Sequence, residues 1–323
     1  MTNEQILDAL GNLDGRALEK AAARRMGAKP RTALRRWVAV AACFVLILSL
    51  AVTTEAASGT VSNLLAPLFH GAQTQIVDQI GKPLHAEASA GGYTIRADAI
   101  LGDRYQFYIV YTLIREDGQP LPENLSLEDW DWNQENFGTG GSLLTPLKRD
   151  AQQPNTAHFW MHCTRKAPVL GRLFTIRFTQ LAISEQNQPV ELFAQGPWEL
   201  TFTLRYPDTS EKLPVFNLRV TDLLGNSYRV KSLILSPVGL HMDLIRFNPH
   251  FPGDVLPVQE FPVSLILADQ TEIILDDLNV ATSLSEGAKK GKAHYTATFP
   301  TPIPREDIAA IRICDTLYQL PVK

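Results

Sequence analysis

The acidic, tryptophan-rich stretch EDWDWNQEN is the most unusual in the chain, and it contains groups that could bind a ligand. Asp129, Asp131 and Asn133 have the spacing of the first three ligands of an EF-hand calcium loop. The later positions depart from that motif, because Gln134 stands where the loop needs glycine and Gly140 where it needs the closing glutamate. The match therefore covers only the first half of an ion site.

Two tryptophans alternate with the acidic residues of this stretch. An exposed indole ring can stack on a sugar ring, so Trp130 and Trp132 suggest a carbohydrate surface. The same alternation also fits one ring in a core and one at its rim, and the sequence leaves both interpretations open. The candidate ligand loop, for an ion or a sugar, comprises Asp129, Trp130, Asp131, Trp132 and Asn133.

A second group of metal-binding residue types consists of His158, His162 and Cys163. Two histidines four residues apart share one face of a helix and can bind one ion, but in a strand they lie about 13 Å apart, which is too far. The apolar residues between them, FWM, favour a strand. We therefore expect surface histidines, with neither a metal nor another cofactor bound.

Motifs of the common enzyme classes are missing from the chain. It contains no nucleophile elbow, zinc-protease helix, phosphate-binding loop or dinucleotide fingerprint. The glycine-rich residues 138–141 lack the strand-to-helix context that a phosphate loop needs, so we do not expect an enzyme. Cys163 and Cys314 fall in different expected domains, and a disulfide between them is not required.

Charge is divided unevenly along the 323 residues, whose formal net charge is −4. Residues 1–36 contain eight Lys or Arg and four Asp or Glu, a local net of +4, which leaves −8 for the remainder. Residues 37–54 between these two parts carry no charge. The near-neutral total argues against a strongly basic nucleic-acid-binding protein, and no direct contact with nucleic acid is expected.

The uncharged stretch WVAVAACFVLILSLAVTT, residues 37–54, predicts one membrane-spanning helix. A helix of this length reaches about 27 Å, close to the ~30 Å of a hydrocarbon core. Three arginines precede the stretch and Glu55 follows it, which places the N-terminus in the cytoplasm and the C-terminal body outside. The expected location is the cell membrane, with lipid as one partner.

Three other interpretations of residues 37–54 stay open. A cleaved signal peptide would end near Thr54, Glu55 and Ala56, although such peptides have a shorter basic region. A lipoprotein would use Cys43, although this residue lies near the start of the apolar run rather than at its end. A buried helix of a soluble protein would not need the charge asymmetry on its two flanks.

Residues 1–36 predict a cytoplasmic head made of a short amphipathic helix and a basic linker. A capping-box pattern opens the helix, and Ile6, Leu10 and Leu13 then recur at helical spacing. So few residues cannot bury a core of their own. We therefore expect this apolar face to bind a cytoplasmic protein or the membrane surface.

Beyond the span, residues 55–72 predict an amphipathic connector, and the hydrophobic period then changes to that of strands. Alternating apolar residues predict a hairpin of strands 93–101 and 105–115 within a first β domain that covers 73–206. Later strands of this domain are expected at 173–183 and 198–205.

A linker is expected at residues 207–214, followed by a second β domain at 215–323. Seven short strands in this domain predict an immunoglobulin-like sandwich; they are 215–221, 227–236, 239–247, 261–268, 272–275, 293–299 and 311–320. The expected fold is therefore mainly β, with a short N-terminal helix, one transmembrane helix and two extracytoplasmic β-sandwiches.

This order of elements, with VSNLLAPLFHG at 61–71 and YTIRADAILGDRYQFYIVYTLIRED at 93–117, resembles the membrane-anchored bacterial family catalogued as domain of unknown function 4179. The strand GPWELTFTLRY at 196–206 is similar to the closing strand of that domain. The C-terminal half resembles the immunoglobulin-like domain that often follows it. Members are often described as anti-sigma-factor-like or as envelope proteins encoded beside sigma factors.

The resemblance implies a single-pass envelope signalling protein of anti-sigma type, with sensing β domains outside and a sigma factor bound by the inner head. Zinc-containing anti-sigma domains need His and paired Cys in the cytoplasmic part, and residues 1–36 contain neither. The head would then act through its helix alone. The alternative is a cell-surface β-sandwich that binds envelope polymer or another protein, or has a structural role, and carries no signal.

Overall fold

The computed structural model describes most of the β-rich body of the chain. The described residues are 65, 74–185, 188–247, 260–275, 280–284 and 291–321. All of them belong to one compact unit, Gly59–Lys323. The expected head, the span and most of the connector lie outside the described residues, as do Ile6, Leu10 and Leu13. No helix among the described residues has the length and apolar character needed to cross a membrane.

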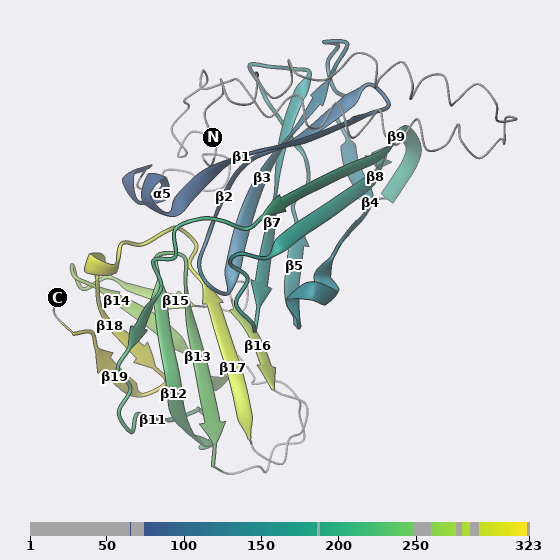
Figure 1. The fold of residues 1–323 in the computed structure, drawn as a ribbon. Coiled ribbons are helices and arrows are strands. Elements are labelled where there is room, and N and C mark those ends of the chain that lie inside the picture. Colours follow the sequence, from purple (N-terminus) through teal and green to yellow (C-terminus); the bar gives the residue numbers. More distant parts are fainter. Residues whose placement is uncertain are drawn as a thin grey trace, which may run out of the picture. The chain divides into compact units, whose positions relative to one another are not determined.

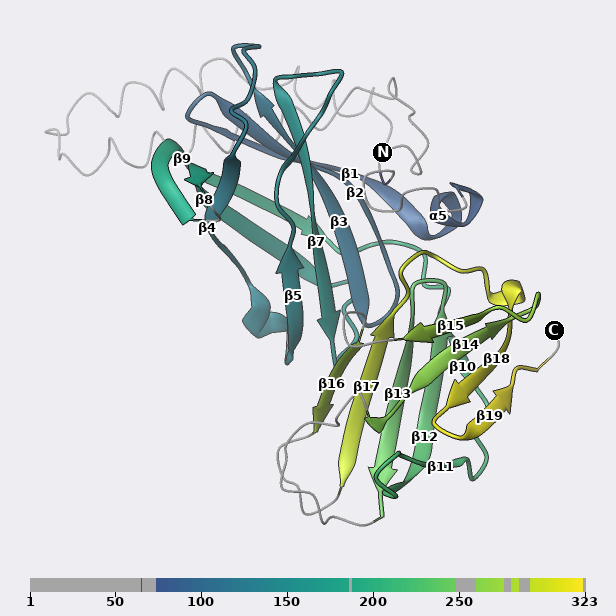
Figure 2. The same cartoon turned by 180° about the vertical axis from the view of Figure 1, so that it is seen from behind.

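The chain is mainly β, and its first half forms two antiparallel sheets (Figures 1 and 2). The larger sheet has the order β1-β2-β3-β7-β5, with β6 also paired to β7, and the smaller has the order β4-β8-β9. The strands are β1 (Gly81–Ala90), β2 (Tyr93–Gly102), β3 (Gln106–Arg115), β4 (Leu125–Trp132), β5 (Gly140–Leu144), β6 (Lys148–Arg149), β7 (Thr156–Arg165), β8 (Leu173–Glu185) and β9 (Gln188–Thr203).

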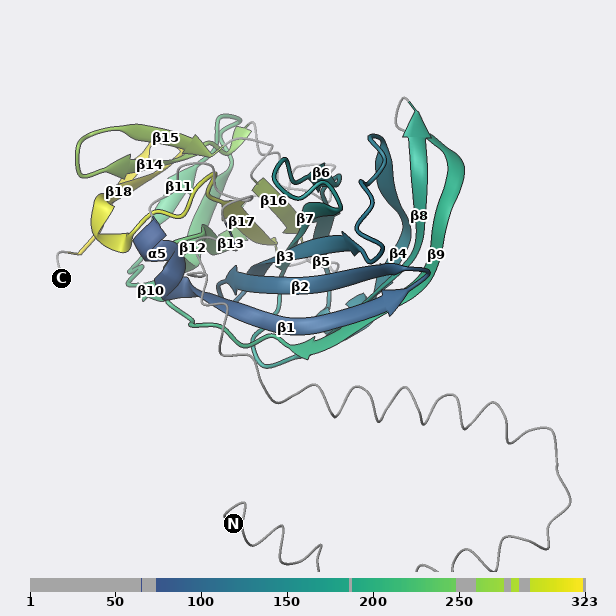
Figure 3. The same cartoon turned by 90° about the horizontal axis from the view of Figure 1, so that it is seen from above.

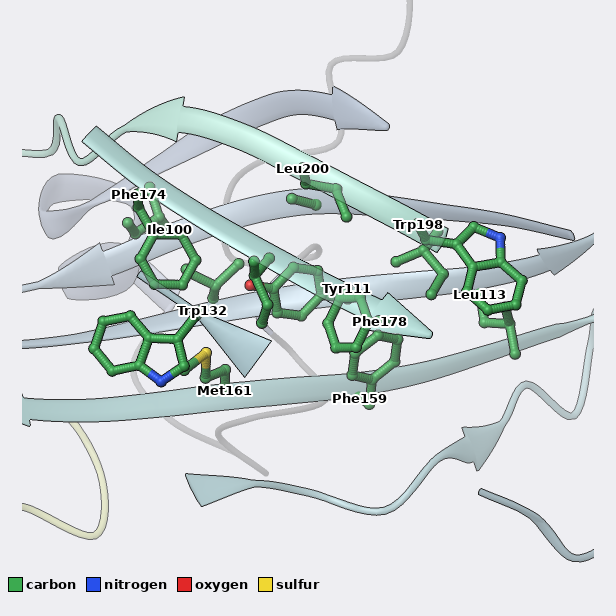
Figure 4. Packing of buried hydrophobic residues seen from close by; sticks show 14 of the residues in the cluster. Ile100, Tyr111, Leu113, Trp132, Phe159, Met161, Phe174, Phe178, Trp198 and Leu200 are labelled. Carbon is green, nitrogen blue, oxygen red and sulfur yellow. The ribbon is translucent and has the colours of Figure 1, made fainter. Parts of the chain in front are cut away.

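The first core lies between these two sheets. Tyr111 of β3 stacks on Phe159 of β7 with ring centroids 4.9 Å apart, and Phe178 of β8 meets both rings edge-on. Figure 4 shows Trp198 and Leu200 of β9 in the same cluster. Alternation explains this core, because every second residue of a strand points to the same face of its sheet.

The predicted hairpin of residues 93–101 and 105–115 is confirmed by the pairing of β2 with β3. The strand β1, which the sequence did not predict, pairs with β2 on its other side. In Figure 3, β9 passes along β1. Gly91 in the β1–β2 turn has φ +58°, and a Cβ there would lie 3.0 Å from the carbonyl oxygen of Gln195, so this turn suits glycine.

The second half forms another pair of antiparallel sheets around its own core. One has the order β10-β12-β13-β17-β16, with β11 also paired to β12, and the other has the order β15-β14-β18-β19. The strands are β10 (Glu211–Leu213), β11 (Arg219–Thr221), β12 (Ser227–Ser236), β13 (Gly239–Arg246), β14 (Val263–Leu267), β15 (Glu272–Leu275), β16 (Val280–Leu284), β17 (Lys292–Thr298), β18 (Ile308–Ile313) and β19 (Thr316–Gln319). Both halves are thus β-sandwiches.

Strand β16 was not among the seven strands expected in the second domain, and three other differences from the sequence-based expectations have a local cause. The helix α5 (Thr74–Ile80) precedes β1 in a region where the sequence predicted strands. Its buried apolar residues, Val77 and Ile80, are three positions apart, which is the spacing of one face of a helix. Residues 211–213 of the expected linker form β10, which pairs with β12. The single strand expected at 311–320 is a hairpin of β18 and β19, because Cys314 takes φ 53° and reverses the chain.

A third apolar cluster covers the outer face of β2 and β3. Leu65, the described residue of the connector, is helical and fully buried there, beside Val77 and Ile80 of α5. Val238, from the turn between β12 and β13 of the second sandwich, belongs to the same cluster. The two sandwiches therefore share a buried contact at this point.

Candidate functional site

The candidate ligand loop lies at the end of β4, and its two tryptophans have different environments. Trp132 is 5% exposed and packs between Phe137 and Phe174, with ring centroids 5.3 and 5.4 Å away. The guanidinium of Arg165 lies 4.4 Å from the Trp132 ring centroid. Figure 4 shows Trp132 in the first core. Of the two indoles, only that of the half-buried Trp130 reaches the surface.

The polar residues of the loop are used largely to join β4 to β8. The side-chain amide of Asn133 donates to the carbonyl oxygen of Leu173 at 3.0 Å and accepts from the Thr175 amide at 3.0 Å. Asp129, with φ 53°, accepts the Thr179 hydroxyl at 2.7 Å. In the part of the chain that the structure describes, no three His, Cys, Asp or Glu side chains gather as metal ligands. Asp129 and Asp131 are the exposed residues of this loop, and the half-buried Trp130 lies between them in the sequence.

The two histidines of HFWMHC lie in strand β7, as the sequence predicted, and they enter separate contacts. His162 stacks on Tyr108 with centroids 4.1 Å apart, and its Nε2 lies 3.3 Å from Oε1 of Gln106. Burial lowers the pKa of His162 to about 4, so this ring is neutral. Cys163 points into the first core, where burial raises its pKa to about 12.

A buried carboxylate that the sequence did not single out joins the two sandwiches. Asp103 lies in the turn between β2 and β3 and is 0% exposed. Its Oδ1 accepts hydrogen bonds from the backbone amides of Tyr105 at 2.7 Å and Gln106 at 3.0 Å. These two bonds close the turn and fix the direction of the carboxylate toward the second sandwich.

The other oxygen of Asp103 is bound mainly from the second sandwich. Oδ2 accepts from Ser236 Oγ at 2.6 Å, His241 Nε2 at 2.9 Å and Gln106 Nε2 at 3.1 Å. Burial acts to raise the pKa of Asp103, but the charge and hydrogen bond of His241, with the bonds from Ser236 and the Tyr105 amide, lower it to about 2. The carboxylate is therefore ionised at neutral pH.

Gln106 makes the second set of bonds across the interface. Its Nε2 also donates to the carbonyl oxygen of Val238 at 3.1 Å, and its Oε1 accepts from Thr298 Oγ1 at 2.9 Å. A Cβ at Gly239 would collide with the side chain of Gln106 and lie 2.5 Å from the carbonyl oxygen of Ala297. We call this group the latch; it comprises Asp103, Gln106, Ser236, His241 and Thr298.

The segment after β9 also touches the latch. The hydroxyl of Tyr206 donates to the carbonyl oxygens of Asp103 at 2.9 Å and Gln106 at 3.3 Å. Tyr206 also lines an open surface groove of about 540 Å³, together with Lys82 and Arg205. The residue that begins the connection between the sandwiches is therefore bonded to the turn that holds them together.

Comparison with protein-family models and with curated proteins finds no match. Among solved structures, the chain is similar to the crystal structure of a conserved domain protein from Bacillus anthracis. The two share 13% sequence identity over 76% of this chain and 78% of that one, with a TM-score of 0.47. The resemblance to the membrane-anchored family stays a prediction from the sequence.

Proposed function

We propose that the chain is a single-pass envelope signalling protein of anti-sigma type. Its β body lies outside the membrane and senses, while the head, residues 1–36, holds a sigma factor inside. The observation that carries this proposal is the order of a patterned basic head, an uncharged stretch and an acidic body in one sequence. The latch supports it, because two sandwiches joined through a buried carboxylate can respond as one body.

The Asp–His pair of the latch has a structural role in this proposal and is not a catalytic dyad. Asp103 and His241 are both shielded from solvent, and so is Thr296, whose hydroxyl lies 3.2 Å from Nδ1 of His241. A general base must reach a substrate proton within hydrogen-bond distance, and these three groups are enclosed by packed strands. The arrangement therefore supports a binding or signalling protein over an enzyme.

A second candidate function is a surface module that binds an envelope polymer or protein without signalling. The second sandwich exposes several large apolar side chains, among them Phe216, which is 99% exposed, Leu223 and Ile274. Exposed apolar groups of this size favour contact with a partner when they are grouped. In this alternative the head serves only as an anchor.

Capture of the full-length chain from detergent-solubilised membranes distinguishes the two functions. Burying a Leu or Ile side chain contributes about 1.5–3 kcal/mol, so Leu10→Asp should abolish binding of the sigma factor. Asn12→Asp is the matched control, because it adds the same charge away from the face of Ile6, Leu10 and Leu13. If both variants capture the same proteins as the wild type, or if no transcription factor is captured, the surface module replaces the anti-sigma proposal.

A further inference from the structure

A line of five side chains runs from the latch to the surface of the second sandwich. His241 Nε2 faces Asp103 Oδ2 at 2.9 Å, and its Nδ1 faces Thr296 Oγ1 at 3.2 Å. The same hydroxyl lies 3.2 Å from His294 Nε2, whose Nδ1 faces Asp243 Oδ1 at 2.9 Å. Strand register produces this order, since His241 is opposite Thr296 and Asp243 is opposite His294 in the β13–β17 pair.

Counting hydrogens shows that this line is incomplete when both rings are neutral. Each carboxylate accepts, so the ring nitrogen facing it carries a hydrogen. The inner nitrogens of His241 and His294 would then both be acceptors, and the Thr296 hydroxyl has a single hydrogen to donate. If one ring carries a second proton, it donates to Oγ1 while the hydroxyl donates to the other ring, and every group is paired.

We propose that His241 and His294 share one proton through the hydroxyl of Thr296, and that this proton makes the contact between the two sandwiches sensitive to pH. The hydroxyl turns toward whichever ring is neutral, so the positive charge can lie beside Asp103 or beside Asp243. Loss of the proton at higher pH removes one hydrogen bond from the line and weakens the latch. This property belongs to the β body and holds whichever function the head has.

Titratable groups face the two rings from the β2–β3 turn and from strands β12 and β13. From the β2–β3 turn, Asp103 is ionised, while burial raises the pKa of Tyr105, whose ring lies 4.8 Å from that of His241, and keeps its hydroxyl neutral. From β13, Asp243 has a lowered pKa through its hydrogen bond with His294. Lys231 of β12 is a further charged neighbour of this carboxylate.

The remaining neighbours add no second positive charge at the latch. His162 of β7 reaches the latch through Gln106 and is neutral, as its lowered pKa shows. Arg104, in the same turn as Asp103, is paired with Asp208, with 2.9 Å between Nη2 and Oδ2. Two carboxylates therefore face the histidine pair directly, and one shared proton leaves that group with a net charge of −1.

The test is nitrogen-15 NMR of histidine side chains in the full-length chain held in detergent micelles, from about pH 5 to pH 9. His241→Gln and His294→Gln assign the two rings. Thr296→Val removes the hydroxyl and keeps the shape of the side chain, and Thr112→Val is the control at another threonine between an aspartate and a histidine. We expect the two rings of the wild type to lose a single common proton, and the two rings of Thr296→Val to titrate separately.

The rate of unfolding gives a second readout that does not depend on ring assignment. Removing one hydrogen bond from the line should speed unfolding of the wild type on the order of tenfold as the shared proton is lost. Thr296→Val and His294→Gln should lose this pH dependence, and Thr112→Val should keep it. Two neutral rings in the wild type at pH 7, or rings that titrate alike with and without the Thr296 hydroxyl, would overturn the proposal.

Discussion

Two lines of side chains in this protein are built from the same residue types, aspartate, histidine and threonine, and they differ in burial. On the outer face of the first sandwich, Thr112 Oγ1 donates to Asp98 Oδ2 at 2.5 Å and lies 3.0 Å from His158 Nδ1, while His158 Nε2 lies 3.4 Å from Asp150 Oδ2. We call this set the surface line; it comprises Asp98, Thr112, His158 and Asp150. The order of aspartate, histidine and threonine recurs in Asp103, His241 and Thr296, where the bond from His241 to Asp103 crosses between the two sandwiches.

Solvent access decides how much each line contributes to stability. The side chains of His158 and Asp150 are 29% and 25% exposed, so water can replace either partner. Those of His241 and Asp103 are 1% and 0% exposed, and a group left unpaired there cannot be hydrated. The same residue types therefore act as replaceable surface contacts in one sandwich and as a required joint between two.

The largest expected effect follows from Asp103→Asn. The amide cannot accept all of the bonds that reach Oδ2, and removing one partner of a buried ion pair costs about 3–5 kcal/mol. The free energy of unfolding of the full-length chain, measured with urea, should fall by this amount. Asp150→Asn is the matched control from the surface line, where about 0–1 kcal/mol is expected. Equal losses for both variants would contradict the role given to burial.

Acid should remove the part of the stabilisation by Asp103 that depends on its charge. Its pKa is about 2 in the folded protein and 3.8 when unperturbed, so ionisation stabilises the fold above about pH 4, and this contribution is lost as pH falls toward 2. The shift corresponds to about 2 kcal/mol. The stability difference between wild type and Asp103→Asn should shrink over this range. A difference that is the same at pH 3 and pH 7 would show that the carboxylate charge is not the cause.

Gly239→Ala tests the latch through shape and leaves its charges unchanged. The added methyl group would collide with the Gln106 side chain and lie 2.5 Å from the Ala297 carbonyl oxygen. Overpacking of this kind typically costs about 1–3 kcal/mol, and calorimetry should show a lower Tm. Gly141→Ala is the control, because the nearest atom to its Cβ, Thr164 Oγ1, would be at 3.5 Å. A Tm equal to that of the control would mean that the sandwiches separate freely at this point.

The smallest expected effect is that of His158→Gln in the surface line. Its contact with Asp150 is long and partly exposed, so the change in unfolding free energy should stay below about 1 kcal/mol. Urea titrations at about pH 6 and pH 8 should give the same small change. A loss as large as that of Asp103→Asn would remove the distinction between the two lines.

Much of the fold could be predicted because burial follows the alternation of residues. The predicted strands at 227–236 and 272–275 coincide with β12 and β15. The strand β1 was missed because no residue after Gly81 in it is buried and because it includes Pro83, which gives it the composition of a loop. The reversal at Cys314 has no glycine or proline to mark it.

The latch could not be predicted from the sequence. Asp103 stands in the turn sequence GDR, where an aspartate that binds nearby amides is ordinary. Its partners Ser236 and His241 lie 133 and 138 residues further along the chain, so no local spacing connects them. The candidate ligand loop shows the opposite case. Its alternating Asp and Trp residues are conspicuous in the sequence and suggested a binding surface, but in the structure Trp132 belongs to the core.

The most direct test of the latch uses two native cysteines. Cys163 lies in the core of the first sandwich and Cys314 in that of the second, and both are buried free thiols. Pulsed thiol labelling of the full-length chain across a urea series, read by peptide mass, therefore follows each sandwich separately. We expect both cysteines of the wild type and of Asp150→Asn to become reactive at one urea concentration, and those of Asp103→Asn at two different, lower concentrations. Separate transitions in the wild type, or coincident and unshifted transitions in Asp103→Asn, would contradict the claim that the latch makes the two sandwiches one unit.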